Sequence, residues 1–159
     1  MNEFNVGAFF DQQMKDELIA FTQELVRIKS YSGQEKDIIT FIAARMESLG
    51  YDEVVVDAMG NVVGRIGQGD QVIMFDSHVD TVEVKDEKEW SVPPFSGNIV
   101  DGRLYGRGSV DMKSAAAASI YGAVLAKRMG WIEGKTVYVS CTVLEEDCDG
   151  ENLKHLFSE

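Results

Sequence analysis

Hydrophobic residues in the first fifty positions recur at helical spacing and predict two helices. The first is expected from about Gln12 to Lys29, with one apolar face. Ser32 and Glu35 have the spacing of a capping box, which predicts that a second helix begins there. Gly50 supplies the C-terminal stop of this second helix. The two apolar faces comprise Leu18, Phe21, Leu25 and Ile28, then Ile38, Ile42, Met46 and Leu49.

After the second helix the hydrophobic pattern changes to that of β-strands. Glu53–Asp57 and Asn61–Ile66 are predicted to be strands on either side of a turn at Met59-Gly60. Gln71–Phe75 is a continuous apolar run, which is typical of a central strand that is covered on both faces. We therefore expect a sheet with residues 71–75 in its interior.

A long polar segment, 76–96, leads to a predicted hairpin. Asp101-Gly102 is a strong signal for a hairpin turn, so Asn98–Val100 and Arg103–Tyr105 are expected to pair as short strands.

The last third of the chain returns to alternating helix and strand. A third helix is expected from about Met112 to Met129, where an alanine-rich stretch allows close packing. Thr136–Val143 is predicted to be a buried strand, and Asn152–Phe157 a further helix. The complete order predicts an α/β fold with a layered mixed sheet and helices on its faces.

Composition narrows the classes of function. The chain has 159 residues, enough for one domain, and 45% of them are hydrophobic. Its net charge of −12 argues against binding to nucleic acid or to anionic membranes. The longest uncharged run, 114–126, is too short to span a bilayer. No signal peptide is recognisable, and Cys141 and Cys148 make no disulfide framework, so a cytoplasmic location is the default.

Three acidic clusters each follow a strand-like run. They are Ser77–Thr81 with His78 and Asp80, Gly106–Lys113 with Asp111, and Leu144–Asp147 with two glutamates. Open α/β sheets usually place their functional sites in loops after strands. A histidine and several carboxylates brought together in this way are typical of a two-metal hydrolase.

Each cluster also has a structural interpretation. His78 and Asp80 point the same way on an extended backbone, so His78 either binds a metal that Asp80 helps to orient or hydrogen-bonds a loop. Asp111 either caps the third helix or bridges two metals. Glu145 and Glu146 either form a solvated loop or face opposite ways from an extended segment, one toward a metal and one toward water.

Other polar residues are weaker candidates. Gly106-x-Gly108 lacks the third glycine of a dinucleotide fingerprint and is not a phosphate loop. An inert thiol is expected at Cys148, and a surface position at His155.

Taken together, the three clusters resemble the zinc-dependent aminoacylase and carboxypeptidase family, which includes acetylornithine deacetylase and succinyl-diaminopimelate desuccinylase. The similarity covers about residues 12–150. The run Val143–Gly150 is similar to that of hydrolases linked to selenium metabolism. The resemblance implies hydrolysis of an amide bond in a peptide or N-acyl amino acid. It also implies two divalent cations, with zinc as the first choice and cobalt or manganese as alternatives.

The resemblance also implies a role for each site residue. His78 would bind one zinc, Glu146 the other, and Asp111 would bridge both. Glu145 would be the general base, and Asp80 would orient His78. The peptide bond after the bridging aspartate is often cis in this family, so a cis Asp111-Met112 bond is expected.

Members of the family continue with another carboxylate ligand, a lid or dimerisation domain and a late histidine ligand. We therefore expect residues 1–159 to be the N-terminal part of a catalytic domain, with little activity alone and an exposed sheet edge that favours homo-oligomers. One alternative is a non-catalytic remnant that binds metal or pairs with a subunit. Another is an unrelated α/β binding domain, in which His78, Asp111 and Glu146 would lie far apart.

Overall fold

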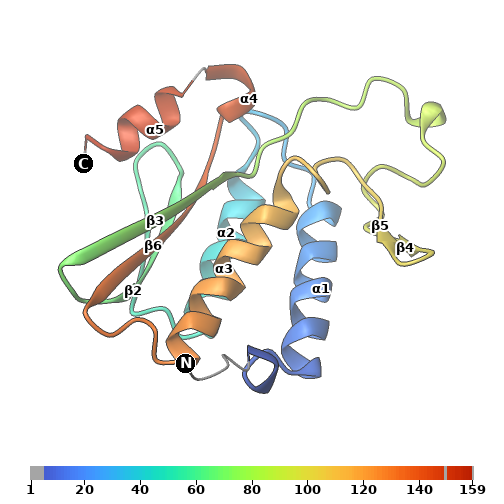
Figure 1. Ribbon diagram of the computed structural model, residues 1–159. Helices are drawn as coiled ribbons and strands as arrows, with labels where there is room; N and C mark the ends of the chain where they lie inside the picture. Colours follow the sequence, from blue (N-terminus) through green and yellow to red (C-terminus); the bar gives the residue numbers. More distant parts are fainter. Residues whose placement is uncertain (1–5, 149, 159) are drawn as a thin grey trace.

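The computed structural model describes residues 6–148 and 150–158, and its centre is a mixed four-stranded sheet (Figure 1). The strands are β1 (Glu53–Val56), β2 (Val62–Gly67), β3 (Gln71–His78) and β6 (Lys135–Thr142), in the order β1-β2-β6-β3. β3 and β6 run parallel, whereas the other neighbouring pairs are antiparallel. The predicted α/β fold with a mixed sheet is thus confirmed.

Three long helices accompany the sheet: α1 (Gln12–Arg27), α2 (Lys36–Ser48) and α3 (Lys113–Arg128). α2 packs on β1 and β2, α3 packs on β3 and β6, and α1 packs against α3 (Figure 1). Apolar side chains buried between these layers form the core. They include Ile42, Met46, Val62, Ile66, Ile120 and Val139, all with no exposed surface.

Shorter elements complete the described chain. The predicted hairpin is present as β4 (Ile99–Val100) and β5 (Arg103–Leu104), and both of its turn residues have positive φ, 49° and 73°. Two short helices, α4 (Glu145–Cys148) and α5 (Glu151–Leu156), follow β6, and 3-10 turns occupy Val6–Ala8 and Glu87–Glu89. Among the described residues, no helix has the length and apolar character needed to cross a membrane.

The prediction that Gln71–Phe75 lies inside the sheet is wrong. Among the described residues, β3 is an edge strand that pairs with β6 alone. Val72 is 63% exposed, and Ile73 and Phe75 are also exposed. An apolar run indicates that a strand is suited to burial, but it does not indicate whether the strand pairs with one neighbouring strand or two.

The predicted capping box is also wrong. α2 begins at Lys36, and its N-cap residue, Glu35, makes no side-chain hydrogen bond to the helix. The Ser32 hydroxyl donates to Asp80, and the Glu35 carboxylate accepts the backbone N–H of Leu144. Both side chains therefore bind the loops that follow β3 and β6 and do not cap α2.

Candidate metal centre

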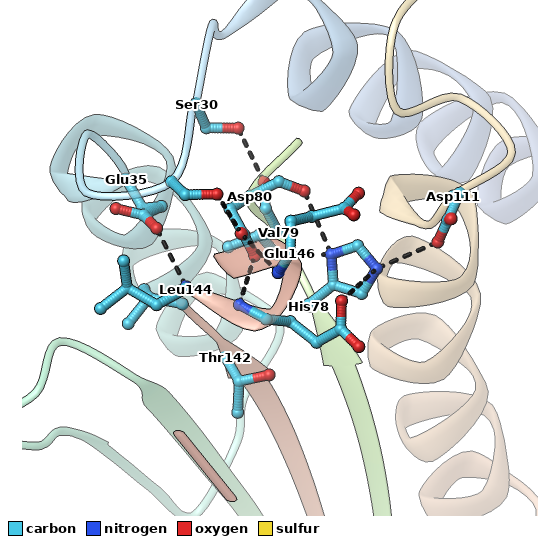
Figure 2. A network of polar contacts seen from close by, with 12 residues as sticks. Ser30, Glu35, His78, Val79, Asp80, Asp111, Thr142, Leu144 and Glu146 are labelled. Carbon is cyan, nitrogen blue, oxygen red and sulfur yellow. Dashed lines mark hydrogen bonds and ion pairs between the residues drawn. The ribbon is translucent and has the colours of Figure 1, made fainter. Parts of the chain in front are cut away.

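Because β3 and β6 run parallel, their carboxyl ends lie side by side, and the two acidic clusters that follow these strands lie close together. His78, the last residue of β3, lies opposite Thr142, the last residue of β6. The chain continues from β6 into α4, which begins with Glu145 and Glu146. The loop before α3 brings Asp111 to the same place, where its Oδ1 lies 3.0 Å from His78 Nε2 (Figure 2).

His78, Asp111 and Glu146 each offer one ligand atom, and these atoms all lie within 4.8 Å of one another. An imidazole nitrogen with carboxylate oxygens is a donor set that zinc accepts. The convergence contradicts the interpretation as an unrelated domain with scattered acids. The residues present therefore fit a divalent cation.

Asp80 contacts one nitrogen of the His78 ring. His78 Nδ1 lies 3.1 Å from the Asp80 carbonyl oxygen and 3.5 Å from the Asp80 carboxylate. This leaves Nε2 facing Asp111. Burial lowers the pKa of His78, but hydrogen bonds to Asp80 and Asp111 outweigh that effect and raise the pKa to about 9. The surroundings of the ring therefore favour a positive charge.

The Asp80 carboxylate is the hub of the polar network in Figure 2. It has no exposed surface, and it accepts the Ser32 hydroxyl at 2.7 Å and the backbone N–H groups of Glu145 and Glu146 at 3.1 Å each. Burial alone would raise the pKa of Asp80, yet the hydrogen bonds from His78, Ser32 and these backbone groups hold it below its usual value. Asp80 thus stays anionic inside the protein.

The opposite side of the site is open to solvent. The Asp111 side chain is 75% exposed, and Glu145, also exposed, has its Oε2 3.7 Å from His78 Nε2. Burial raises the pKa of Glu146; His78 opposes this rise, and the neighbouring carboxylates add to it. Crowded carboxylates repel one another unless a cation lies between them.

The local structure of the glutamate pair differs from the prediction. Leu144 has a φ of 60°, and Glu145 and Glu146 begin a helical turn, not an extended segment. The two side chains therefore do not alternate across a strand. The expected cis peptide bond between Asp111 and Met112 is present.

Several residues that hold the site were not predicted from the sequence. The sequence pattern predicts helix caps at Ser32 and Glu35 and a strand position at Asn61. In the fold, Ser32 donates to Asp80, Glu35 accepts the Leu144 N–H, and Asn61 accepts the Val143 N–H at 3.0 Å. Glu35 and Asn61 are buried and Ser32 is half-buried, and their contacts with these loops become visible only in the fold. Cys148 lies near Asn152, and His155 lies near Asp57, so neither belongs to the metal group.

Comparison with known proteins assigns this chain to a family. Residues 74–158, which include all three residues of the metal group, match the model of peptidase family M20/M25/M40. The chain belongs to this family. It is also 37% identical, over 134 residues, to the uncharacterized protein YgeY of Escherichia coli (strain K12). That alignment covers 84% of this chain but 33% of YgeY, so the chain spans about a third of its curated relative.

Solved structures agree with this family fold. Human carnosine dipeptidase 1 superimposes with a TM-score of 0.80 at 19% identity, covering 95% of this chain and 37% of the dipeptidase. The YXEP protein of Bacillus subtilis, described as a dinuclear metal binding peptidase, gives a TM-score of 0.61 at 20% identity, covering 84% and 36%. At these identities the likeness establishes the fold alone.

Proposed function

We propose that this chain provides the N-terminal share of the catalytic metal centre of a hydrolase that cleaves an amide bond in a peptide or an N-acyl amino acid. The observation that carries the proposal is the convergence of His78, Asp111 and Glu146. Membership of a peptidase family supports it. So do the names of two structural relatives, one a dipeptidase and the other a dinuclear metal binding peptidase.

In this proposal the centre holds two divalent cations. His78 would hold one, Glu146 would hold the other, and Asp111 would contribute to both. Zinc is the first choice, with cobalt or manganese as alternatives, since histidine–carboxylate sites accept several ions. When bound, such cations supply a water molecule of lowered pKa and an electrophile for the scissile carbonyl.

The residues of the chain divide the remaining work. Glu145 lies beside His78 on the solvent side and acts as the general base, taking a proton from the attacking water and giving it to the leaving amine. Asp80 orients His78 through Nδ1, so that Nε2 stays available to a cation. The exposure of Asp111 leaves room for a substrate to approach.

A narrower assignment rests on one sequence run. Val143–Gly150 is similar to hydrolases linked to selenium metabolism, although Asp149 within it lies outside the described residues. Deacetylase or aminoacylase activity and a cytoplasmic location belong to the same proposal.

The second candidate function is a non-catalytic domain that binds metal or pairs with a subunit. The exposed apolar edge of β3 favours it. Such a domain would bind zinc without supporting hydrolysis.

Equilibrium dialysis of zinc against the purified chain tests the proposal. We expect measurable zinc binding in the native chain and its loss in Asp111→Asn. Asp101→Asn, in the β4–β5 turn, is the matched control, because Asn is tolerated at positive φ as Asp is. Zinc binding that is absent from the native chain, or that Asp111→Asn leaves unchanged, would remove the basis for the proposal.

A further inference from the structure

Side chains from elsewhere in the chain hold the turn that carries the two glutamates. Four consecutive backbone N–H groups, from Val143 to Glu146, each donate to a side-chain oxygen. Val143 donates to Asn61 and Leu144 to Glu35, both at 3.0 Å, while Glu145 and Glu146 donate to the two oxygens of Asp80. These bonds lie outside the strand ladder, so the direction of the turn depends on the side chains that accept them.

Leu144 is the pivot of this turn. Its φ of 60° is a left-handed conformation that is unfavourable for a residue other than glycine. The Glu35 carboxylate, which is only 5% exposed, accepts the N–H of this same residue. Glu35 therefore helps to fix the direction in which the chain leaves β6 and enters α4.

Ser32 reaches the same turn by a second route. Its hydroxyl donates to the Asp80 oxygen that also accepts the Glu146 N–H. Asp80 in turn contacts Nδ1 of His78. The Ser32 hydroxyl thus binds the carboxylate that contacts both the histidine and the glutamate turn.

The connection between α1 and α2 that contains Ser32 and Glu35 is itself bound to the segment that follows β3. The Ser30 hydroxyl donates to the Val79 carbonyl at 2.7 Å, and the Ser30 carbonyl accepts the Thr81 N–H at 2.9 Å. Tyr31 forms a parallel bridge with Thr81. The connection is therefore a rigid support beside both metal-binding loops.

We infer that Ser32 and Glu35 are positioning residues of the metal centre, which set the places of His78 and Glu146 through Asp80 and Leu144. Neither belongs to the metal group itself. The inference rests on the proposed function, because it requires that His78, Asp111 and Glu146 bind a divalent cation. It goes further by assigning the metal-binding geometry to a segment that precedes the matched family region, 74–158.

Titration of the purified chain with Co²⁺, followed by its visible absorption spectrum, tests the inference. Loss of an outer hydrogen-bond partner typically weakens metal binding about 10–100-fold, and we expect this loss for Glu35→Ala together with an altered spectrum. Glu35→Gln keeps an oxygen that can accept the Leu144 N–H, so its affinity should stay within about threefold of native. Ser32→Ala should weaken binding about tenfold.

Matched controls are available on α2. Glu47→Ala removes an exposed glutamate and Ser48→Ala an exposed serine, and both should bind Co²⁺ as the native chain does. Circular dichroism and thermal unfolding establish that each variant is folded at the titration temperature. If Glu35→Ala does not fold, Glu35→Gln and Ser32→Ala carry the test.

The outcomes separate this inference from the proposed function. If the native chain binds no Co²⁺, or if His78→Ala binds Co²⁺ as well as the native chain does, the proposed metal centre itself is wrong. A native chain that binds Co²⁺ through His78, while a folded Ser32→Ala or Glu35→Ala retains native affinity and spectrum, overturns the positioning role alone. Equal losses in Glu35→Gln and Glu35→Ala would also overturn it, because the hydrogen bond to Leu144 would not be the cause.

Discussion

His78 and Thr142 lie directly opposite each other, as the last residues of two adjacent parallel strands. Because both strands end at the same edge, the loop after β6 begins beside the imidazole. A shift of the pairing by one residue would turn every side chain of β3 to the other face of the sheet. One strand register thus decides whether the metal group exists.

The purified 159-residue chain is expected to show no measurable hydrolysis of N-acetyl amino acids or dipeptides. Catalytic zinc usually has three protein ligands. Here His78, Asp111 and Glu146 would be shared between two cations, leaving each with fewer. Detection of released amine checks this expectation. Turnover by the native chain that disappears in Glu145→Gln would contradict it.

Replacing Gly64 with alanine should destabilise the fold by about 1–3 kcal/mol, the usual cost of overpacking a core. An added Cβ at Gly64 would lie 2.5 Å from the Tyr51 ring and 2.7 Å from Met46 Sδ. Denaturant unfolding measures the effect. Gly122→Ala is the control: its Cβ meets nothing within 4 Å, and alanine favours the helix by about 1 kcal/mol. Equal stabilities for the two variants would show that the packing around Gly64 is not tight.

Asp52 should contribute to stability at neutral pH and lose that contribution in acid. A hydrogen bond from Lys127, and then one from the Gly67 N–H, hold the pKa of Asp52 below its usual value. A carboxyl with a lowered folded-state pKa stabilises the fold above its unfolded pKa of about 3.9, and the contribution disappears as the pH falls through the folded value.

Asp52→Asn should therefore lower the free energy of unfolding at pH 7 by at most about 1 kcal/mol, because the pair with Lys127 is exposed. The deficit should shrink below about pH 4. Urea unfolding at both pH values, with the exposed Asp70→Asn as control, measures it. A deficit that stays constant across this range would rule out the ion pair as its source.

The open edge of β3 is expected to cause self-association, which Val72→Lys should reduce. An unpaired strand edge with apolar side chains is a template for another strand, and lysine is a residue that natural edges use to prevent such pairing. Val72 is 63% exposed, so the substitution should leave the core intact. Sedimentation velocity over a range of concentrations measures the shift toward monomer. Val55→Lys on β1, the opposite edge, is the control, and an unchanged distribution for Val72→Lys would exclude β3 as the contact.

Local patterns predicted much of the fold. The β4–β5 hairpin follows from Asp101-Gly102, because both residues favour the positive φ that the turn requires. The three long helices follow from their apolar faces. For the candidate site, the resemblance supplied His78, Asp111 and Glu146, which the fold brings together. Their roles as ligands, and those of Glu145 and Asp80, stay predictions.

The features of the fold and the site that the sequence does not predict depend on contacts between distant parts of the chain. An apolar run does not reveal that β3 has one neighbour, and the spacing of Ser32 and Glu35 does not reveal that Asp80 and Leu144 compete successfully for their side chains. The left-handed Leu144 is equally invisible, because leucine has no local preference for it. These features arise only when the layers pack.

The edge position of β3 also has a consequence for the order in which the site assembles during synthesis. β3 pairs with β6 alone, and β6 is made long after His78 has left the ribosome. Early-made helices can form while the chain is still growing, but the strand that carries His78 has no partner until residues 135–142 emerge. The two loops that carry His78 and the glutamates therefore come together only after residues 135–142 have been made, and a cation could bind the complete metal group only after that pairing.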